Sequence, residues 1–280
     1  MSETNRIRIG NQTAYSASTA MEPFEYAVAN GFDAFEWFPD KEESGRGWTV
    51  SDISKETRAM VKNIALDHDI YLSVHSHCHL NLLRPDDHEL LLKDIDFARD
   101  VSASLLNIHL QSDETIAAHA VAIIALMRRL TPLQIRLSIE NTPSTAPEHF
   151  NELFRRLRGL VSPDKPNLGM CLDLGHANLW DATRNDYLRF IDLLDPHVPI
   201  IHIHLHENYG DQDSHLPLFS GPSGKNPNGI EGFIQRMRQR YFSGCIILEQ
   251  WPHPPSLLSE ARNRLRHMIG SSVNQRSNLT

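Results

Sequence analysis

The sequence predicts a single α/β domain folded as a (β/α)8 barrel, and three observations lead to that prediction. Short β-branched or apolar runs alternate strictly with longer amphipathic stretches, as parallel strands joined by helices do. There are eight such units within 280 residues, which is the number and size that this barrel needs. Six consecutive runs end in an acidic or imidazole side chain, at the edge where these barrels place their active sites.

The elements follow one another without a change in composition that would mark a linker. The expected strands span residues 6–10, 32–38, 70–76, 104–110, 134–140, 167–173, 198–206 and 244–250. The expected helices lie near residues 21–31, 51–68, 87–103, 113–130, 147–160, 184–194, 229–241 and 256–269. Gly31 suits the position just after the first helix, and Ser51 is the expected N-cap of the second.

The domain prediction is one barrel over residues 1–280, with a core at about 6–269 and a polar tail at 270–280. A doubly wound open sheet is the alternative. It is disfavoured because no GxGxxG motif follows the first strand.

Composition narrows the class of protein. The net charge of −8 lacks the basic balance of most nucleic-acid binders and favours small substrates or metal ions. Three cysteines without a CxxC motif suggest neither a disulfide framework nor a zinc ribbon, and they fit a reducing cytoplasm. The N-terminus has no apolar signal-peptide core, and no apolar run approaches the about 20 residues that span a bilayer. We therefore expect a cytoplasmic protein without a membrane partner.

The residues that end the strands carry the chemistry. They are His75, His109, Glu140, Asp173, His204 with His206, and Glu249. Each follows a largely apolar run, where a charge is costly without a partner. Strand side chains alternate between faces, so small or polar residues such as Ser138 and Cys171 precede the charged residue on its own face. This pattern predicts a polar barrel mouth. Imidazole and carboxylate together indicate a divalent metal site for zinc, manganese, cobalt or iron rather than calcium, and magnesium is a further candidate.

The chain resembles the xylose isomerase-like TIM-barrel superfamily, which holds sugar isomerases and epimerases together with apurinic-site endonucleases of the endonuclease IV type. The resemblance covers about residues 6–269. It is carried by VHSHCHLNLL (74–83), NIHL (107–110), IEN (139–141), LDLGHAN (172–178), HLHEN (204–208), DSH (213–215) and ILEQ (247–250).

The resemblance implies two alternative metal sites. Isomerases and epimerases of the superfamily commonly hold one divalent metal, and the matching ligands here are Glu140, Asp173, His204 and Glu249. The two glutamates would also serve as acid and base, and His176 would touch substrate or a second metal. The endonuclease type holds three zinc ions, and its additional ligands match His75, His109, His176, Asp213 and His215.

Two departures from the endonuclease pattern disfavour DNA as a partner. After His75 that family usually has a small residue, a proline and an aromatic, whereas this chain has Ser76, His77 and Cys78. No loop combines several basic residues with aromatics, as a clamp on a nucleic-acid backbone would require.

Three functions therefore stay open. The first is an isomerase, epimerase or related lyase acting on a small sugar, polyol or sugar phosphate, with Glu140 and Glu249 moving the proton. The second is a multinuclear zinc hydrolase of a small phosphoester. The third is a barrel that binds metal or a metabolite without catalysis. A homo-oligomer is a further expectation.

Substrate contacts are expected from loops 39–48, 81–87 and 208–229 and from side chains near the mouth. The candidates are His77, His206, Trp37, Phe38, Trp48, Trp180, Trp251, Arg84 and Lys225, the last two as phosphate contacts. Core packing is the alternative role for the tryptophans.

Overall fold

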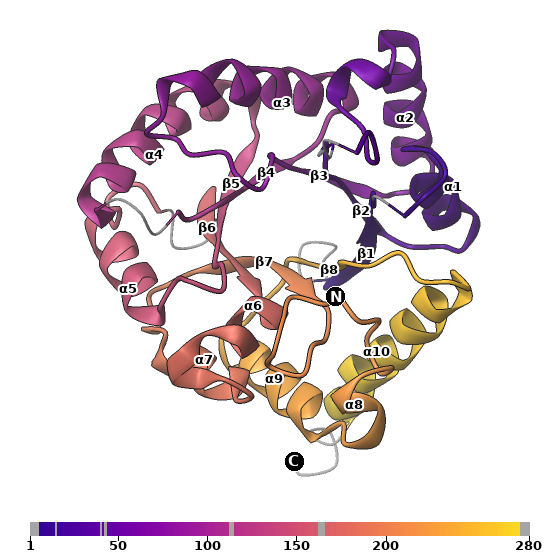
Figure 1. Cartoon of the computed structure of the whole chain (residues 1–280), viewed down its shortest axis with the longest axis vertical. Helices are drawn as coiled ribbons and strands as arrows, with labels where there is room; N and C mark the ends of the chain where they lie inside the picture. The colour runs from indigo at the N-terminus through magenta and orange to yellow at the C-terminus, as the bar shows by residue number, and fades with distance from the viewer. Residues whose placement is uncertain are drawn as a thin grey trace.

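The computed structural model describes residues 6–14, 16–39, 41, 44–111, 115–161 and 166–274, with side chains up to 270. Eight parallel strands form a closed barrel in sequence order, which confirms the predicted fold class. Figure 1 looks into this barrel and shows the helices as a ring around it. The strands are β1 Arg8–Gln12, β2 Ala34–Trp37, β3 Tyr71–His75, β4 Leu105–His109, β5 Arg136–Glu140, β6 Leu168–Asp173, β7 Ile200–Leu205 and β8 Cys245–Leu248.

Each strand lies within its predicted range or within two residues of it, and the helices differ more. The helices are α1 Glu22–Ala29, α2 Lys55–Asp67, α3 His88–Val101, α4 Ile116–Leu130, α5 Pro147–Arg156, α6 Leu174–Leu179, α7 Tyr187–Leu193, α8 Pro222–Lys225, α9 Asn228–Gln239 and α10 Ser256–Asn274. The short helices α6 and α8 were not predicted. α10 extends into the predicted polar tail as far as Asn274, and residues 275–280 lie outside the described part.

The N-cap prediction for the second helix is wrong by three residues. Ser51 lies in a 3-10 turn, Val50–Asp52, which precedes α2. Ser54 caps α2 instead, because its hydroxyl accepts the backbone N–H of Thr57 at 3.2 Å. Gly31 follows α1 with a φ of 67°, the left-handed backbone expected there.

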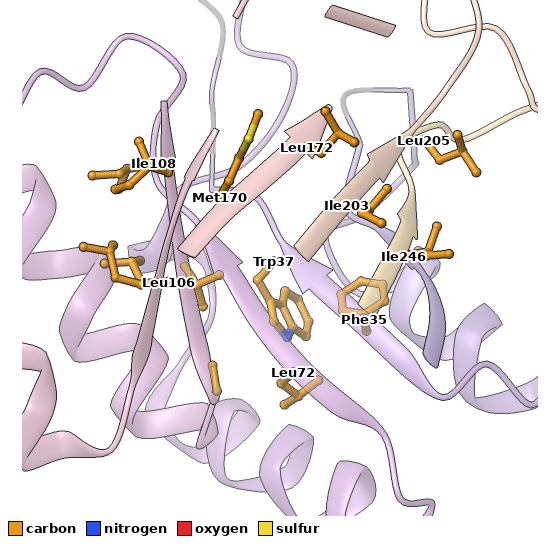
Figure 2. Close-up of a cluster of buried hydrophobic side chains, with 14 of the residues drawn as sticks. Phe35, Trp37, Leu72, Leu106, Ile108, Met170, Leu172, Ile203, Leu205 and Ile246 are labelled. Atoms are coloured by element: carbon orange, nitrogen blue, oxygen red, sulfur yellow. The ribbon is translucent and has the colours of Figure 1, made fainter. Parts of the chain in front are cut away.

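The outer face of the strands forms the main core. Phe35 and Trp37 of β2, Leu106 and Ile108 of β4, and Ile203 of β7 lie along this face in Figure 2. They belong to one buried cluster with side chains from the surrounding helices. This wall of apolar contacts fixes the strand ends relative to one another.

One stretch, Ile116–Leu133, is long and apolar enough by composition to cross a membrane. It comprises α4 and the turn after it. Ile123, Leu126 and Leu130 of α4 are buried in the core, and the helix of a folded core can pass the same test of length and composition. The stretch is therefore weak evidence for a membrane span.

Candidate metal centre

The carboxyl ends of six neighbouring strands bring the predicted site residues together. Strand pairing places His109 beside Glu140 and Asp173 beside His204. His75 ends β3, and Glu249 directly follows β8. All of these side chains except His109 are nearly or fully buried. The sequence pattern at the strand ends therefore corresponds to one compact site inside the barrel mouth.

The site contains five overlapping groups of side chains whose ligand atoms lie within 4.8 Å of one another, and three of these groups contain all the predicted ligands. The first group, which we call the histidine–glutamate group, contains His75, His109 and Glu140. The second, the four-ligand group, contains Glu140, Asp173, His204 and Glu249. The third, the outer group, contains His176, His206, Asp213 and His215. Together they hold all nine residues that the resemblance implied, with His206 in addition.

Glu140 belongs to two of these groups through both of its oxygens. Its Oε2 lies 3.1 Å from Nε2 of His75 and 3.2 Å from Nδ1 of His204. Its Oε1 lies 3.4 Å from Nε2 of His109 and 3.4 Å from Nδ1 of His176. Burial alone would raise the pKa of Glu140, but the surrounding histidines hold it well below its ordinary value. Glu140 is thus an ionised carboxylate whose two oxygens face different histidines of the site.

The four-ligand group offers the kind of donor atoms that a divalent metal takes. Among the described residues, Oε1 of Glu140, Oε2 of Glu249 and Nδ1 of His204 are buried without a hydrogen-bond partner. Every ion pair of these carboxylates and of Asp173 in the described part of the chain is with a histidine. Buried carboxylates without lysine or arginine need another cation, and Glu, Asp and His are the donors that zinc and similar ions take. These residues therefore fit a divalent metal.

Asp173 is positioned by the helix that follows it. Its Oδ1 caps α6 by accepting the backbone N–H of His176 at 2.6 Å, which leaves Oδ2 turned to the histidines. Asn141 fixes both residues. Its side chain bonds the backbone N–H and C=O of Asp173 at 2.9 Å each, and its carbonyl accepts Nδ1 of His176 at 2.8 Å.

The outer group brings residues from the loop after β7 onto the barrel. Oδ2 of Asp213 lies 3.2 Å from Nε2 of both His176 and His215. Burial would lower the pKa of His215, but the hydrogen bond to Asp213 raises it to about 9. His206 stacks on His215, with ring centroids 3.9 Å apart, and its Nε2 lies 3.2 Å from Oδ2 of Asp173. His206, expected among the substrate contacts, thus lies among candidate metal ligands.

Glu36 is a site residue that the sequence analysis missed. It lies on β2, is fully buried and faces the barrel interior, whereas its neighbour Trp37 faces the outer side of the strand. Its Oε2 accepts Nε2 of His202 at 2.8 Å, and its Oε1 lies 2.7 Å from Nε2 of His204. Glu36 therefore leaves Nδ1 of His204 facing the carboxylates, the arrangement in which a carboxylate orients a metal-binding histidine. Glu36 in the middle of the run FDAFEWF was the available signal, because a charge between apolar neighbours requires a buried partner.

Asn107 on β4 is a second missed residue. Its Nδ2 donates to Oε2 of Glu140, and its Oδ1 accepts the hydroxyl of Ser138 at 2.6 Å. This chain of bonds holds the shared carboxylate in place from the floor of the site.

Several expected substrate contacts do not lie where a substrate could reach them. Trp37 and Trp48 pack edge to face with centroids 5.6 Å apart in the apolar layer, because Trp37 occupies the outer face of β2. Trp251 is buried against Tyr26 of α1. These three tryptophans are part of the buried core, which is the alternative role given for them.

The remaining candidates lie around the mouth. His77 is half-buried in the turn after β3, where its Nδ1 accepts the backbone N–H of His79. Arg84 and Lys225 are exposed, in the loop before α3 and in α8. Loop 39–48 lies partly outside the described residues.

Comparison with known proteins agrees with the geometry. A family model described as "Xylose isomerase-like TIM barrel" matches residues 24–268. An uncharacterized protein of Methanocaldococcus jannaschii, MJ1311, is 30% identical over 122 residues, which are 41% of this chain and 36% of that protein. The chain therefore matches only about a third of that relative's length.

Solved structures show the same fold at low identity. A D-tagatose 3-epimerase-like protein superposes with a TM-score of 0.71 at 18% identity, over 95% of this chain and 100% of that one. Endonuclease IV from Thermus thermophilus has a TM-score of 0.65 at 19% identity, covering 94% and 99%. The TTHB071 protein of the same organism, from a crystal soaked with zinc chloride, has a TM-score of 0.62 at 20% identity, covering 95% and 99%.

Proposed function

This chain belongs to the xylose isomerase-like TIM-barrel family, and we propose that within this family it is a multinuclear metal-dependent hydrolase of small phosphoesters. The observation that carries the proposal is the outer group. A mononuclear isomerase would need only the four-ligand group. His176, His206, Asp213 and His215 form a further set of imidazole and carboxylate donors beside it.

The chain's residues would divide the ions among them. Glu140, Asp173, His204 and Glu249 would hold one ion, His75 and His109 with Glu140 a second, and the outer group a third. Bound there, divalent ions supply Lewis-acid stabilisation of the attacking and leaving oxygens of a phosphoester. Zinc suits these mixed nitrogen and oxygen donors best.

The buried carboxylates of the site favour metal binding before substrate binding. Glu36, Glu140, Asp173 and Glu249 place four carboxylates in a buried volume, so an anionic substrate is repelled until cations are present. The buried walls exclude water from the reacting oxygens, which strengthens every electrostatic interaction at the site. Phosphoester binding should therefore depend on prior metal loading.

The substrate is proposed to be small rather than a DNA duplex. The net charge of −8 opposes binding to a polyanion. The chain also lacks the proline and aromatic that follow the first metal-binding histidine in the endonuclease pattern, because Ser76, His77 and Cys78 stand there.

A sugar isomerase or epimerase is the second candidate, and the pair of glutamates favours it. Glu140 and Glu249 approach Nδ1 of the same histidine, His204, at 3.2 and 3.4 Å. Two carboxylates on either side of one ligand could serve as acid and base at a substrate carbon. This candidate leaves the outer group without a role.

Metal stoichiometry discriminates between the two. Untagged protein reconstituted with zinc and dialysed should contain two or three ions per chain by plasma mass spectrometry. Asp213→Ala should lose one of them, whereas Asp211→Ala, an exposed change in the same loop, should lose none. Hydrolysis of nitrophenyl phosphate or of its diester should fall with the lost ion. One ion per chain, unchanged by Asp213→Ala, together with turnover of ketoses, would replace the hydrolase with the isomerase.

A further inference from the structure

A further group of possible metal ligands lies deeper in the barrel than the four-ligand group. Cys171, His202 and His204 have ligand atoms within 4.8 Å of one another, and we call them the cysteine–histidine group. Strand pairing places Cys171 of β6 beside His202 of β7, two residues before the pair formed by Asp173 and His204. The two histidines point into the barrel, because Ile203 between them lies in the outer layer (Figure 2). The group therefore lines the barrel interior next to the four-ligand group.

Glu36 leaves one nitrogen of each histidine open to an ion. Nε2 of His202 donates to Oε2 of Glu36 at 2.8 Å, and Nε2 of His204 lies 2.7 Å from Oε1. Nδ1 of each histidine is buried and, among the described residues, has no hydrogen-bond partner. A carboxylate on one ring nitrogen is the usual support of a histidine that binds metal through the other. Both imidazoles are therefore prepared as ligands through Nδ1.

Cys171 supplies the donor that distinguishes this group from the four-ligand group. Its thiol is free and fully buried. One sulfur and two imidazole nitrogens form a soft set of donors, whereas the four-ligand group has three carboxylates and one imidazole. Thiolates select ions such as copper(I), while carboxylates suit harder divalent ions. The two groups should therefore prefer different metals.

The number of donors also favours copper(I) over zinc. In the described part of the chain the cysteine–histidine group has three donors. All three side chains are fully buried, so the bulk solvent does not supply a fourth. Structural zinc is almost always four-coordinate, whereas copper accepts a trigonal set of two histidines and one cysteine.

His204 belongs to both groups and cannot serve both at once. Its Nδ1 lies 3.2 Å from Oε2 of Glu140 and 3.4 Å from Oε2 of Glu249 in the four-ligand group. Its Nε2 faces Glu36, and each imidazole nitrogen binds one partner at a time. An ion in one group therefore takes a ligand from the other.

We propose that the cysteine–histidine group binds copper(I), and that this binding displaces the ion of the four-ligand group. The proton of the Cys171 thiol leaves to solvent as the copper–sulfur bond forms. The site goes beyond the proposed hydrolysis, which uses neither Cys171 nor His202, and only the displacement rests on that function. Copper(I) would then be an inhibitor that acts through His204.

The test measures copper(I) binding to the metal-free protein under argon by competition with the chelator bicinchoninate. Cys78→Ser is the parent for all variants, because the Cys78 thiol is partly exposed and would also bind copper. Cys171→Ser should weaken binding at least about 100-fold, since it removes the softest donor. Cys245→Ser is the matched control and should bind as the parent does. Cys245 is a second buried thiol, paired with His202 in the strand register but outside the group.

Two further measurements make the test specific. X-ray absorption of the copper-loaded parent should show sulfur and nitrogen neighbours of copper, so the site is tested even if Cys171→Ser does not fold. Copper(I) added to the zinc-loaded parent should release zinc to a chromophoric chelator. Cys171→Ser should retain its zinc under the same conditions, and Cys245→Ser should release it.

Equal copper(I) affinity of the parent and a Cys171→Ser variant that melts like it would overturn the inference. A copper site without sulfur would do the same, and zinc that stays bound in the copper-loaded parent would overturn the displacement. The outcomes also separate this inference from the proposed function. Protein that takes up no zinc but binds copper through Cys171 supports the site and contradicts the hydrolase. A zinc-loaded hydrolase whose activity and zinc content are indifferent to copper(I) supports the function and contradicts the inference.

Discussion

The two faces of the same barrel wall have opposite chemistry. On β2, Phe35 and Trp37 point outward into the apolar layer beneath the helices, while Glu36 between them points inward. On β7, Ile203 and Leu205 point outward, while His202 and His204 point inward. Removing apolar surface from water stabilises the outer face, whereas burying charge destabilises the inner face. The apolar packing of the outer face therefore offsets the free-energy cost of the charged interior. A bound cation would lower that cost.

The largest expected effect is on the inner face, at the carboxylate that two groups share. Glu140→Gln keeps the shape and removes the charge, so both ions that it would bridge should bind weakly. We expect hydrolysis to fall by about 10²–10³-fold, as when a group that stabilises transition-state charge is removed. Zinc content should fall together with turnover, and full retention of both would contradict the bridging position. Glu152→Gln, on the outer surface of α5, is the matched control.

Trp37→Ala tests the outer face. Removing this fully buried ring leaves a cavity, and we expect the free energy of unfolding to fall by about 3–5 kcal/mol. Urea titration followed by circular dichroism measures that loss. Zinc stoichiometry of the folded variant should match wild type. A loss of zinc without a loss of stability would show that the two faces are not separable in this way.

Glu36→Gln tests the contact that orients His204. Glu36 holds this histidine but is not itself a predicted metal ligand. We expect the affinity for zinc to fall about 10–100-fold, as for other carboxylates that orient a metal-binding histidine. Competition with a chromophoric chelator gives the affinity. The melting temperature of the metal-free variant serves as the control for folding. An unchanged affinity would restrict Glu36 to a structural role.

The smallest expected effect is a pH dependence of the metal-free protein. The pKa of His215 is raised to about 9 in the folded state, against about 6.5 when unfolded. Its ion pair with Asp213 should therefore stabilise the fold fully below pH about 6.5 and lose that contribution as the pH rises through about 9. Both side chains are about one-third exposed, so the difference should be well under the full linkage value. Thermal melts at pH 6 and pH 9.5 should show a larger decrease for wild type than for Asp213→Asn.

Much of the fold could be predicted from local periodicity. Short apolar or β-branched runs marked each strand, a terminal acidic or imidazole side chain marked six of them, and all eight lie near their predicted positions. The helix α6 escaped prediction because it has six residues, contains Gly175 and begins directly after a strand. Its cap is Asp173, a residue that the sequence pattern assigned to the metal site alone.

The site was predictable only as a set of residue types at strand ends. Alternation along β7 predicted that His202, His204 and His206 share one face. It could not predict that Glu36 contacts His202 and His204 or that His206 belongs to the outer group. Trp37, Trp48 and Trp251 show the same limit, because each packs against a helix distant in the sequence, α3 through Phe97 or α1 through Tyr26.

The order of the elements, and which side chains reach the inner edge of each strand, follow from the amino-acid sequence alone, because both depend on the near-neighbour pattern of polar and apolar residues. How those side chains are grouped depends on the tertiary fold. Closure of the barrel brings Glu140 between His75, His109, His176 and His204, and the loop after β7 folds back to bring Asp213 and His215 beside them. Distances between strands follow from closure and packing, which the pattern within one strand does not contain.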